Sequence, residues 1–416
     1  MRGGPGGAPP LIVAVHLLLR GRLDVERLRG AVIELVRRHP ILRTNYASLG
    51  DGEVLAIVHE TEGPDVFSVA PSSGLSDEND IHEHVVRTFE DLSRNFLALN
   101  RHSILQAVLL PHGENRHSLI FAVDHIAIDE RSRVILQREL AALYAGRRDE
   151  LGEVHSYDPD AIRSTFPRVE ETPALRDLLT PLPPRFLASP DPRSGPEAFR
   201  TLTAAQPLAP ETTARLDAAA RRARCTRFVL HLAAAMWALK QFSRSDDIGL
   251  VAPIDTRQRA EDFRAVGFYQ NLVLLRSRSP RAAGLTETLR ECRAIMRETF
   301  QRRDHPIAAL VAHAAAELGE NRYRNPLYQV ALIHTAEDSG PGWTLDGLDV
   351  RAREIGRSQA AHELRMHVAD HPDRTELLLV GAAGAFAQPD LDHLLTLWQR
   401  AETALTAPES ERAEPA

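Results

Sequence analysis

The sequence has little cysteine and no long apolar run. Its 416 residues include two cysteines, Cys225 and Cys292. Both lie in helical-looking, apolar stretches, which argues against a disulfide framework or a thiolate metal site and predicts two core residues. No apolar run reaches the length that spans a bilayer, and the N-terminal MRGGPGGAPP lacks the charged-then-apolar order of a secretory signal. We therefore expect a cytoplasmic protein without a membrane partner.

Lysine is almost absent, and the overall charge is not basic. Lys240 is the single lysine among 50 basic residues, so arginine supplies nearly all of the positive charge. The formal net charge at pH 7 is −7. Proteins that bind nucleic acid present a basic surface, so this balance argues against nucleic acid as a partner.

The hydrophobic content and one proline-rich stretch predict two domains. Hydrophobic residues make up 43% of the chain, which is enough for two cores of ordinary size. Seven prolines occur between Pro173 and Pro196, where the periodic patterns fade. Residues 173–198 are therefore expected to be an interdomain linker between domains at 1–172 and 199–405. The polar residues 406–416 are expected to be a disordered tail.

The spacing of apolar residues predicts helices and strands in both halves. Asp24 is expected to cap a helix that ends at Pro40, and the chain is expected to resume as a strand after this proline. Further helices are expected at 82–99, 131–145, 210–224, 226–242, 285–300 and 389–405, and strands at 11–19, 53–59, 103–111, 117–125, 248–254, 271–277, 327–335, 364–370 and 376–381. Strands and helices without a strict alternation indicate an α+β fold, with each half a sheet covered by helices.

The segment LIFAVDHIAIDERS, residues 119–132, carries the most suggestive chemistry. An apolar strand ends there, and Asp124, His125 and Asp129 follow one another within six residues. Ile126 and Ile128 are expected to point into the core and leave His125 facing a cleft. An imidazole near neutrality can take a proton from an attacking amine or hydroxyl. Asp129 could orient the imidazole or pair with an arginine.

Several further segments, in order, resemble the motifs of one enzyme superfamily. His125 and Asp129 fall on the second histidine and the aspartate of the HHxxxDG signature of condensation domains. The other resembling segments are RHPILRT (38–44), LYAGRR, VGFYQNLVLLR (266–276), RRDHPIAALV (302–311) and NRYRNPLYQV (321–330). Asn271 and Arg324 lie at matching positions in the third and the last of these. The chain is thus identified as a member of the superfamily that includes condensation domains of nonribosomal peptide synthesis, free-standing condensation enzymes and polyketide-associated acyltransferases.

The resemblance implies a fold of two chloramphenicol-acetyltransferase-like halves in a V-shaped pseudo-dimer, with a tunnel between them. It implies acyl transfer from a thioester to an amine or alcohol. The donor would be carried on the phosphopantetheine of an acyl or peptidyl carrier protein, or on coenzyme A, with no bound cofactor or metal. His125 would act as the base or position the nucleophile, and Asp129 would form a structural salt bridge, for which Arg257 is the expected partner. A monomer is expected.

The sequence departs from the family pattern in three ways. Asp124 replaces the first histidine, and its carboxylate could either join a hydrogen-bond network or face the imidazole and raise its pKa. Glu130 replaces the glycine after the aspartate and adds charge at the expected tunnel floor. The family's opening segment is absent, and an aromatic-rich segment is reduced to HSYDPDAIRSTF, in which Tyr157 and Asp158 remain.

Two functions therefore stay open. The first is a free-standing condensation-type acyltransferase of specialised metabolism. The second is a degenerate condensation-like domain that recruits partner enzymes to a carrier-bound peptide without catalysing. Other histidines have spacings that metals use, namely His82, His84, His112 and His117. They lack an evident third ligand, and we expect them to be solvated.

Overall fold

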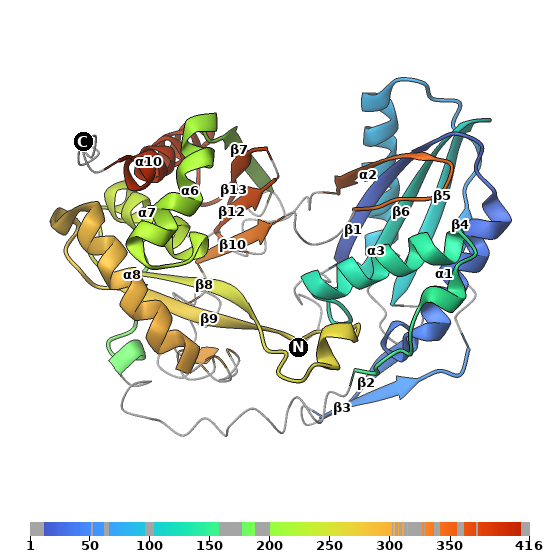
Figure 1. Ribbon diagram of the computed structural model, residues 1–416, viewed down its shortest axis with the longest axis horizontal. Coiled ribbons are helices and arrows are strands. Elements are labelled where there is room, and N and C mark those ends of the chain that lie inside the picture. The colour runs from blue at the N-terminus through green and yellow to red at the C-terminus, as the bar shows by residue number, and fades with distance from the viewer. Residues whose placement is uncertain are drawn as a thin grey trace. The chain divides into compact units, whose positions relative to one another are not determined.

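The computed structural model describes residues 12–50, 53–61, 66–95, 104–157, 177–187, 200–301, 303, 307, 310, 311, 314, 327, 329–336, 342–355, 362–371 and 373–408. They form two compact units, coloured along the chain in Figure 1. Unit 1 is drawn from Met1–Asp160, Arg257–Tyr269 and Ser339–Gly356, and unit 2 from Ala161–Thr256, Gln270–Asp338 and Arg357–Ala416.

The units are not contiguous in the sequence, in contrast to the expected domains. Residues 257–269 and 339–356 follow the proline-rich segment in the chain, yet they pack within unit 1. The second of these segments contains a strand that pairs with the first strand of the chain. Hydrogen bonds to distant segments therefore decide which unit these residues join, and local periodicity does not reveal them.

Unit 1 is built on a five-stranded sheet in the order β11-β1-β6-β5-β4. Its strands are β1 (Ile12–Arg20), β4 (Phe67–Val69), β5 (Leu105–Gly113), β6 (Arg116–Asp124) and β11 (Asp349–Glu354). Neighbouring strands are antiparallel, except that β4 and β5 are parallel. A separate hairpin joins β2 (Thr44–Gly50) and β3 (Glu53–Val58). Alternate residues of β1, β5 and β6 face opposite sides, so this central part of the sheet is apolar on both faces.

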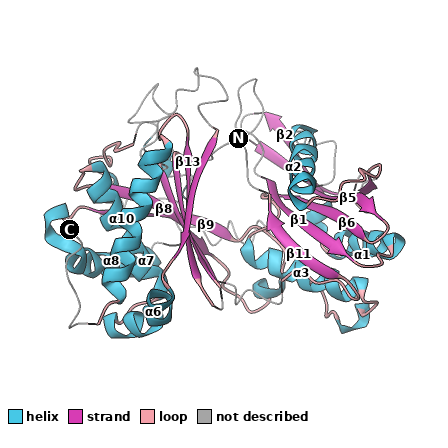
Figure 2. Cartoon of the chain, turned by 90° about the horizontal axis from the view of Figure 1, so that it is seen from above, coloured by secondary structure: helices cyan, strands magenta, loops and turns pink. Residues whose placement is uncertain are grey.

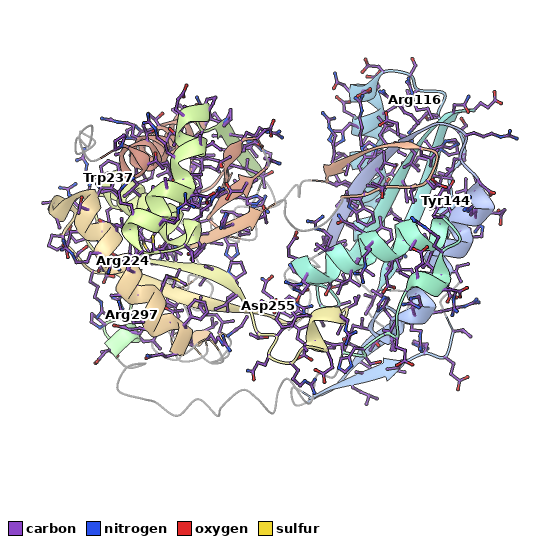
Figure 3. All side chains as sticks on the ribbon, viewed as in Figure 1. Arg116, Tyr144, Arg224, Trp237, Asp255 and Arg297 are labelled. Carbon is purple, nitrogen blue, oxygen red and sulfur yellow. The ribbon has the colours of Figure 1, made fainter. Side chains whose placement is uncertain are left out.

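Three helices cover these two faces. The helices α1 (Val25–Arg38) and α3 (Glu130–Tyr144) pack on one face, and α2 (Glu78–Asn95) packs on the other. As predicted, the Asp24 side chain accepts a hydrogen bond from the Arg27 N–H and caps α1, and a short 3-10 turn begins at Pro40. Tyr144, labelled in Figure 3, is buried at the end of α3. α3 thus starts directly after residues 124–129, and the buried side chain of Tyr144 anchors the C-terminal end of the helix.

Unit 2 is built on a six-stranded mixed sheet in the order β7-β13-β12-β10-β8-β9. Its strands are β7 (Thr201–Pro207), β8 (Ile248–Asp255), β9 (Gln270–Ser277), β10 (Val330–Ala336), β12 (Leu364–Asp370) and β13 (Thr375–Ala382). The helices α6 (Pro210–Ala223), α7 (Arg227–Ser243), α8 (Gly284–Gln301) and α10 (Gln388–Thr406) lie on one face of this sheet (Figure 2). Each unit is therefore a helix-covered sheet, as the α+β prediction requires.

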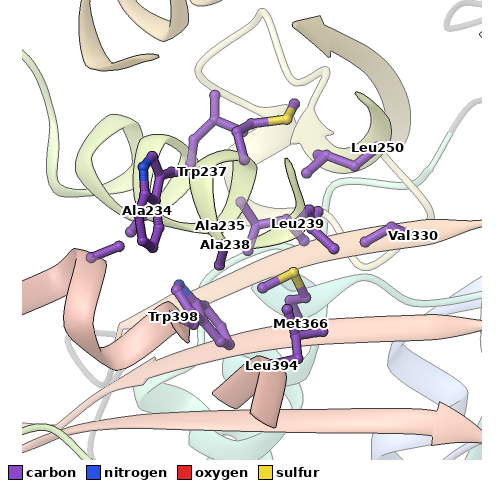
Figure 4. Close-up of a cluster of buried hydrophobic side chains, with 14 of the residues drawn as sticks. Ala234, Ala235, Trp237, Ala238, Leu239, Leu250, Val330, Met366, Leu394 and Trp398 are labelled. Atoms are coloured by element: carbon purple, nitrogen blue, oxygen red, sulfur yellow. The ribbon is translucent and has the colours of Figure 1, made fainter. Parts of the chain in front are cut away.

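The core of unit 2 lies between α7, α10 and the sheet. Figure 4 shows Trp237 and Ala238 of α7 near Trp398 of α10 and Met366 of β12. α7 is buried over most of its length, as its nearly uniform apolar composition predicts. Cys292 is buried in this core, as predicted, whereas Cys225 is partly buried and packs against it.

Part of the proline-rich segment is packed onto unit 2. Leu179 is buried against Leu274, and Leu187 joins the main core of the unit. Arg276 donates hydrogen bonds to the carbonyls of Leu178 and Pro181, at 2.6 and 2.8 Å. The described residues 177–187 are thus an integral part of unit 2, in contrast to the expected linker. Among the helices of the described residues, none is both long and apolar enough to cross a membrane.

Candidate active site

Residues 124–129 form a tight turn between β6 and α3. β6 ends at Asp124, whose carbonyl accepts a hydrogen bond from the Ala127 N–H at 3.0 Å. The Asp124 carboxylate is buried and accepts a hydrogen bond from the Ile126 N–H at 3.1 Å. Asp124, at the position of the family's first histidine, therefore takes part in the hydrogen bonding of the turn, which is the first of the two alternatives left open by the sequence.

Two buried side chains anchor this turn. Ala127 and Ile128 lie in the core between the sheet and the helices α1 and α3. Ile126 is 38% exposed, so the prediction that it points into the core is wrong, whereas the same prediction for Ile128 is confirmed. The turn does not continue the alternation of a strand, because β6 has already ended at Asp124.

His125 is held in one orientation by the backbone of the same turn. Its Nδ1 lies 2.7 Å from the carbonyl oxygen of Ile128. A carbonyl only accepts hydrogen bonds, so Nδ1 carries a proton and the lone pair of the neutral imidazole is on Nε2. The edge of the ring meets Phe268, with ring centroids 5.4 Å apart and an interplanar angle of 80°. The side chain is half-buried. A fixed imidazole with its basic nitrogen at Nε2 is the form that a general base requires.

Asp129 caps α3 and forms the expected ion pair with Arg257. One carboxylate oxygen, Oδ1, accepts the Ser132 N–H at 2.8 Å, which is an N-cap hydrogen bond. Oδ2 accepts Arg257 Nη1 at 2.6 Å and the Tyr269 N–H at 3.1 Å, and Arg257 Nη2 reaches Oδ1 at 3.1 Å. Asp129 therefore pairs with an arginine, which is the second of the two alternatives left open by the sequence.

Arg257 is held by the segment that follows it. Its Nε donates to the Asp262 carbonyl at 2.8 Å, and Nη2 lies 3.3 Å from the Ala265 carbonyl. The guanidinium also stacks over the Tyr269 ring, 4.1 Å from its centroid. Burial raises the pKa of the Tyr269 phenol to about 12, so this ring stays neutral. Residues 257–269 are thereby fixed against the N-terminal end of α3.

Tyr157, Gly267 and Ser132 complete this arrangement and were not assigned to the site from the sequence. Ser132 Oγ accepts the Gly267 N–H at 3.0 Å and lies 2.8 Å from the Gly267 carbonyl. A Cβ at position 267 would overlap the Tyr157 ring, so only glycine fits there. Tyr157 also donates a hydrogen bond from its hydroxyl to the Phe268 carbonyl at 3.1 Å. The Tyr157 remnant and the glycine of VGFYQN were the available signals, but the sequence does not show that they meet.

The remaining predicted residues lie outside this cluster or outside the described residues. Glu130 begins α3, is exposed and forms an ion pair with Arg133. Asn271, in unit 2, donates from its side-chain amide to the Arg303 carbonyl at 2.9 Å and accepts the Ile307 N–H at 3.3 Å, so it joins β9 to the following segment. Arg324 and Asp158, like most of 302–311 and 321–330, lie outside the described residues.

The prediction that the N-terminal histidines are solvated is wrong for His112 and His117. Both are buried. Ser118 Oγ lies 2.9 Å from His112 Nε2 and 2.7 Å from His16 Nε2, and Ser73 Oγ lies 2.7 Å from His112 Nδ1. The strand pairing of β1, β5 and β6 brings these residues together, and the spacing along the sequence does not reveal it.

Known proteins resemble this chain over nearly its whole length. The family model described as Condensation domain matches residues 11–414. Tyrocidine synthase 2 of Brevibacillus parabrevis is 27% identical over 413 residues, which covers 96% of this chain and 11% of that protein. This chain thus spans about one tenth of the length of that synthase.

Solved structures show the same fold. The X-domain from teicoplanin biosynthesis aligns with a TM-score of 0.77 at 23% identity, over 98% of this chain and 92% of that one. The first condensation domain of the calcium-dependent antibiotic synthetase, in complex with a substrate analogue, aligns with a TM-score of 0.73 at 18% identity, over 97% of this chain and 92% of that one. From the family match over nearly its whole length, this chain belongs to the condensation-domain family.

Proposed function

We propose that this chain is a condensation-type acyltransferase that joins an acyl thioester to an amine or alcohol acceptor in the biosynthesis of a specialised metabolite. The family match supports the reaction class. The donor would be presented on the phosphopantetheine arm of a carrier protein, as the resemblance to nonribosomal peptide synthetases implies. The orientation of His125 is the single observation that carries the proposal.

His125 supplies the base. With Nδ1–H donated to the Ile128 carbonyl, 2.7 Å away, the lone pair on Nε2 accepts the proton of the attacking amine or hydroxyl. The acceptor's nitrogen or oxygen bonds to the thioester carbonyl carbon and forms a tetrahedral intermediate. Collapse of that intermediate breaks the carbon–sulfur bond. The proton held on Nε2 passes to the departing thiolate, so the reaction ends with an amide or ester, a free thiol and a neutral histidine.

Asp129 and Arg257 act as positioning residues in this scheme. Their bidentate pair fixes the first turn of α3 against residues 257–269. Phe268, which lies in that segment, packs its ring against the His125 ring. The salt bridge therefore restrains both sides of the imidazole without taking part in proton transfer.

A specific observation favours one alternative, recruitment without catalysis. Asp124 replaces a histidine of the family signature, and the fold aligns well with an X-domain, which has also been solved in complex with OxyB. In that alternative the chain would bind a carrier-presented peptide and a partner enzyme, and His125 would be a relic. The retained ion pair between Asp129 and Arg257 fits both functions, because its role is structural.

The test is product formation measured by intact mass spectrometry. The 416-residue chain is incubated with an acyl-loaded carrier protein and a panel of amines and alcohols, without any other biosynthetic enzyme. A parallel reaction replaces the carrier protein with acyl-coenzyme A donors. Wild type is compared with His125→Ala and with His393→Ala, which changes an exposed histidine on α10.

The proposal predicts turnover by wild type and by His393→Ala, and its loss in a folded His125→Ala protein. Turnover without any other biosynthetic enzyme is the result expected of a free-standing enzyme. Wild type that forms no product with any donor, yet binds the loaded carrier protein as tightly as His125→Ala does, would contradict catalysis and favour recruitment.

A further inference from the structure

Unit 2 contains a cluster of metal-ligating side chains far from His125 in the sequence. His231 on α7, His334 on β10 and Asp370 at the end of β12 each offer one ligand atom, and these atoms all lie within 4.8 Å of one another. No metal site is predicted from the sequence, in which these residues are 36 or more positions apart. α7 packs over the sheet (Figure 4), and the fold brings the three ligand atoms together.

The surroundings of His231 hold its ring in an orientation that suits a metal ligand. It is completely buried, and its Nδ1 lies 2.9 Å from Oε1 of Glu402 on α10. A carboxylate accepts the Nδ1 proton, so in the neutral form of the ring, which binds metals, the lone pair is on Nε2. Among the described residues, Nε2 has no hydrogen-bond partner. A buried nitrogen lone pair without a partner is unfavourable, and a bound cation would satisfy it.

The other two ligands already contact each other. His334 Nε2 lies 2.9 Å from Asp370 Oδ2, and the rings of His231 and His334 lie 5.1 Å apart at 61°. Thr375 donates from Oγ1 to Asp370 Oδ1 at 2.6 Å, which fixes the carboxylate. One contact competes with a cation, since Arg227 Nη1 lies 3.2 Å from Asp370 Oδ2. Arg227 has a second partner in Asp217, at 2.6 Å, toward which it can shift.

We propose that His231, His334 and Asp370 bind one divalent transition-metal ion of the zinc type. Two imidazoles and a carboxylate are a donor set that zinc and cobalt accept, with a fourth position left for water. The Glu402 carboxylate behind His231 supplies the outer hydrogen bond that metal-bound histidines commonly make. Tetrahedral bonds of about 2.0–2.1 Å would place the donor atoms about 3.3 Å apart. The cluster therefore needs a contraction of about 1.5 Å at its widest.

The ion would join four elements of unit 2. It would bind α7, β10 and β12 directly, and α10 through the hydrogen bond between Glu402 and His231. Because a ligand that binds only the folded state stabilises it, the ion is expected to raise the resistance of unit 2 to unfolding.

The test is titration of tag-free, chelator-treated protein with Co²⁺, followed by visible d–d absorption and by calorimetry, with Zn²⁺ added to displace Co²⁺. His334→Ala removes the least buried ligand and leaves the buried pair of His231 and Glu402 intact. His367→Ala is the matched control, because His367 also lies on β12 but contacts Thr335. His231→Ala is not used as the main variant, since a change at this buried position can prevent folding.

Wild type and His367→Ala are expected to bind one equivalent of Co²⁺ with a tetrahedral-type spectrum, to lose it to Zn²⁺ and to gain thermal stability with Zn²⁺. His334→Ala is expected to bind Co²⁺ at least about 100-fold more weakly. The absence of saturable Co²⁺ binding in wild type would overturn the proposal. Equal binding by wild type and His334→Ala would overturn it too, since the ion would then be held elsewhere.

Discussion

At the residue scale, His125 and Asp129 have different partners in the structure. His125 is oriented by the carbonyl of Ile128, a neighbour in its own turn. Asp129, four residues later, is committed to Arg257 and to the N-cap of α3. The two most prominent residues of the motif therefore have different roles, and their variants should fail in different ways.

Asp129→Asn should destabilise the protein strongly. The substitution removes the charge that neutralises Arg257, and both side chains are buried. Breaking one side of a buried ion pair lowers the free energy of unfolding by about 3–5 kcal/mol. Chemical denaturation measures this loss. Glu130→Gln is the control, because the exposed pair of Glu130 with Arg133 should contribute below about 1 kcal/mol. Equal stabilities for the two variants would show that the pair with Arg257 does not hold α3.

Gly267→Ala should destabilise through a clash with one ring. The added Cβ would overlap Tyr157, whose hydroxyl is tied to the Phe268 carbonyl. Overpacking of this kind lowers the free energy of unfolding by about 1–3 kcal/mol. In a Tyr157→Ala background the same substitution should have a smaller effect, because the ring is gone. An unchanged effect in that background would mean that the glycine is required for its backbone and not for the space it leaves.

At the element scale, the sequence predicted the central strands and the helices well. Apolar patterns located β1, β6, β8, β12 and every helix of the described residues from α1 to α10 to within a few residues. The strands β4, β7 and β11 were missed. All three lie at sheet edges, and β7 and β11 are largely exposed, so they carry no strong apolar pattern.

The candidate site could be predicted only in part for a related reason. His125 and Asp129 lie four positions apart in the sequence, and the family resemblance indicated Arg257. The contacts of Ser132 with Gly267 and of Tyr157 with Phe268 join residues more than one hundred positions apart. Such long-range contacts depend on the tertiary fold, and they cannot be predicted from the composition or the local periodicity of the sequence.

The sheet face under α2 should make unit 1 sensitive to acid. Burial, reinforced by neighbouring histidine charges, lowers the pKa of His16 and of His112 from 6.5 to about 4. The unfolded chain therefore takes up protons at these sites before the folded chain does, and protonation favours unfolding. The free energy of unfolding is expected to be highest above pH 6.5 and to fall as the pH drops from there to about 4.

Denaturant midpoints measured between about pH 7 and about pH 5 test this expectation. His112→Gln removes one of the two titrating groups, so the difference between the midpoints should shrink relative to wild type. His393→Gln, an exposed change in unit 2, should leave the difference as it is. A midpoint that does not change with pH in wild type would show that the folded protein takes up protons at these histidines as readily as the unfolded chain does.

At the scale of the whole molecule, sequence order and spatial units differ. Residues 257–269 lie between β8 and β9 of unit 2 in the chain, but they pack in unit 1 and carry Arg257 and Phe268 to the turn of His125. The candidate active site therefore depends on two distant parts of the chain, and the family match from residue 11 to 414 covers both. The central claim remains chemical: Nε2 of His125 accepts the acceptor's proton.

The most direct test is the single-turnover rate of acyl transfer by His125→Asn. An asparagine amide can place an N–H near the position of Nδ1 and keep the hydrogen bond to the Ile128 carbonyl, but it has no counterpart of Nε2. We expect a folded protein with an unchanged denaturation midpoint and a rate lower than that of wild type by about 100-fold to 10,000-fold. A His125→Asn protein that transfers the acyl group at the wild-type rate would contradict the role of Nε2 as the base.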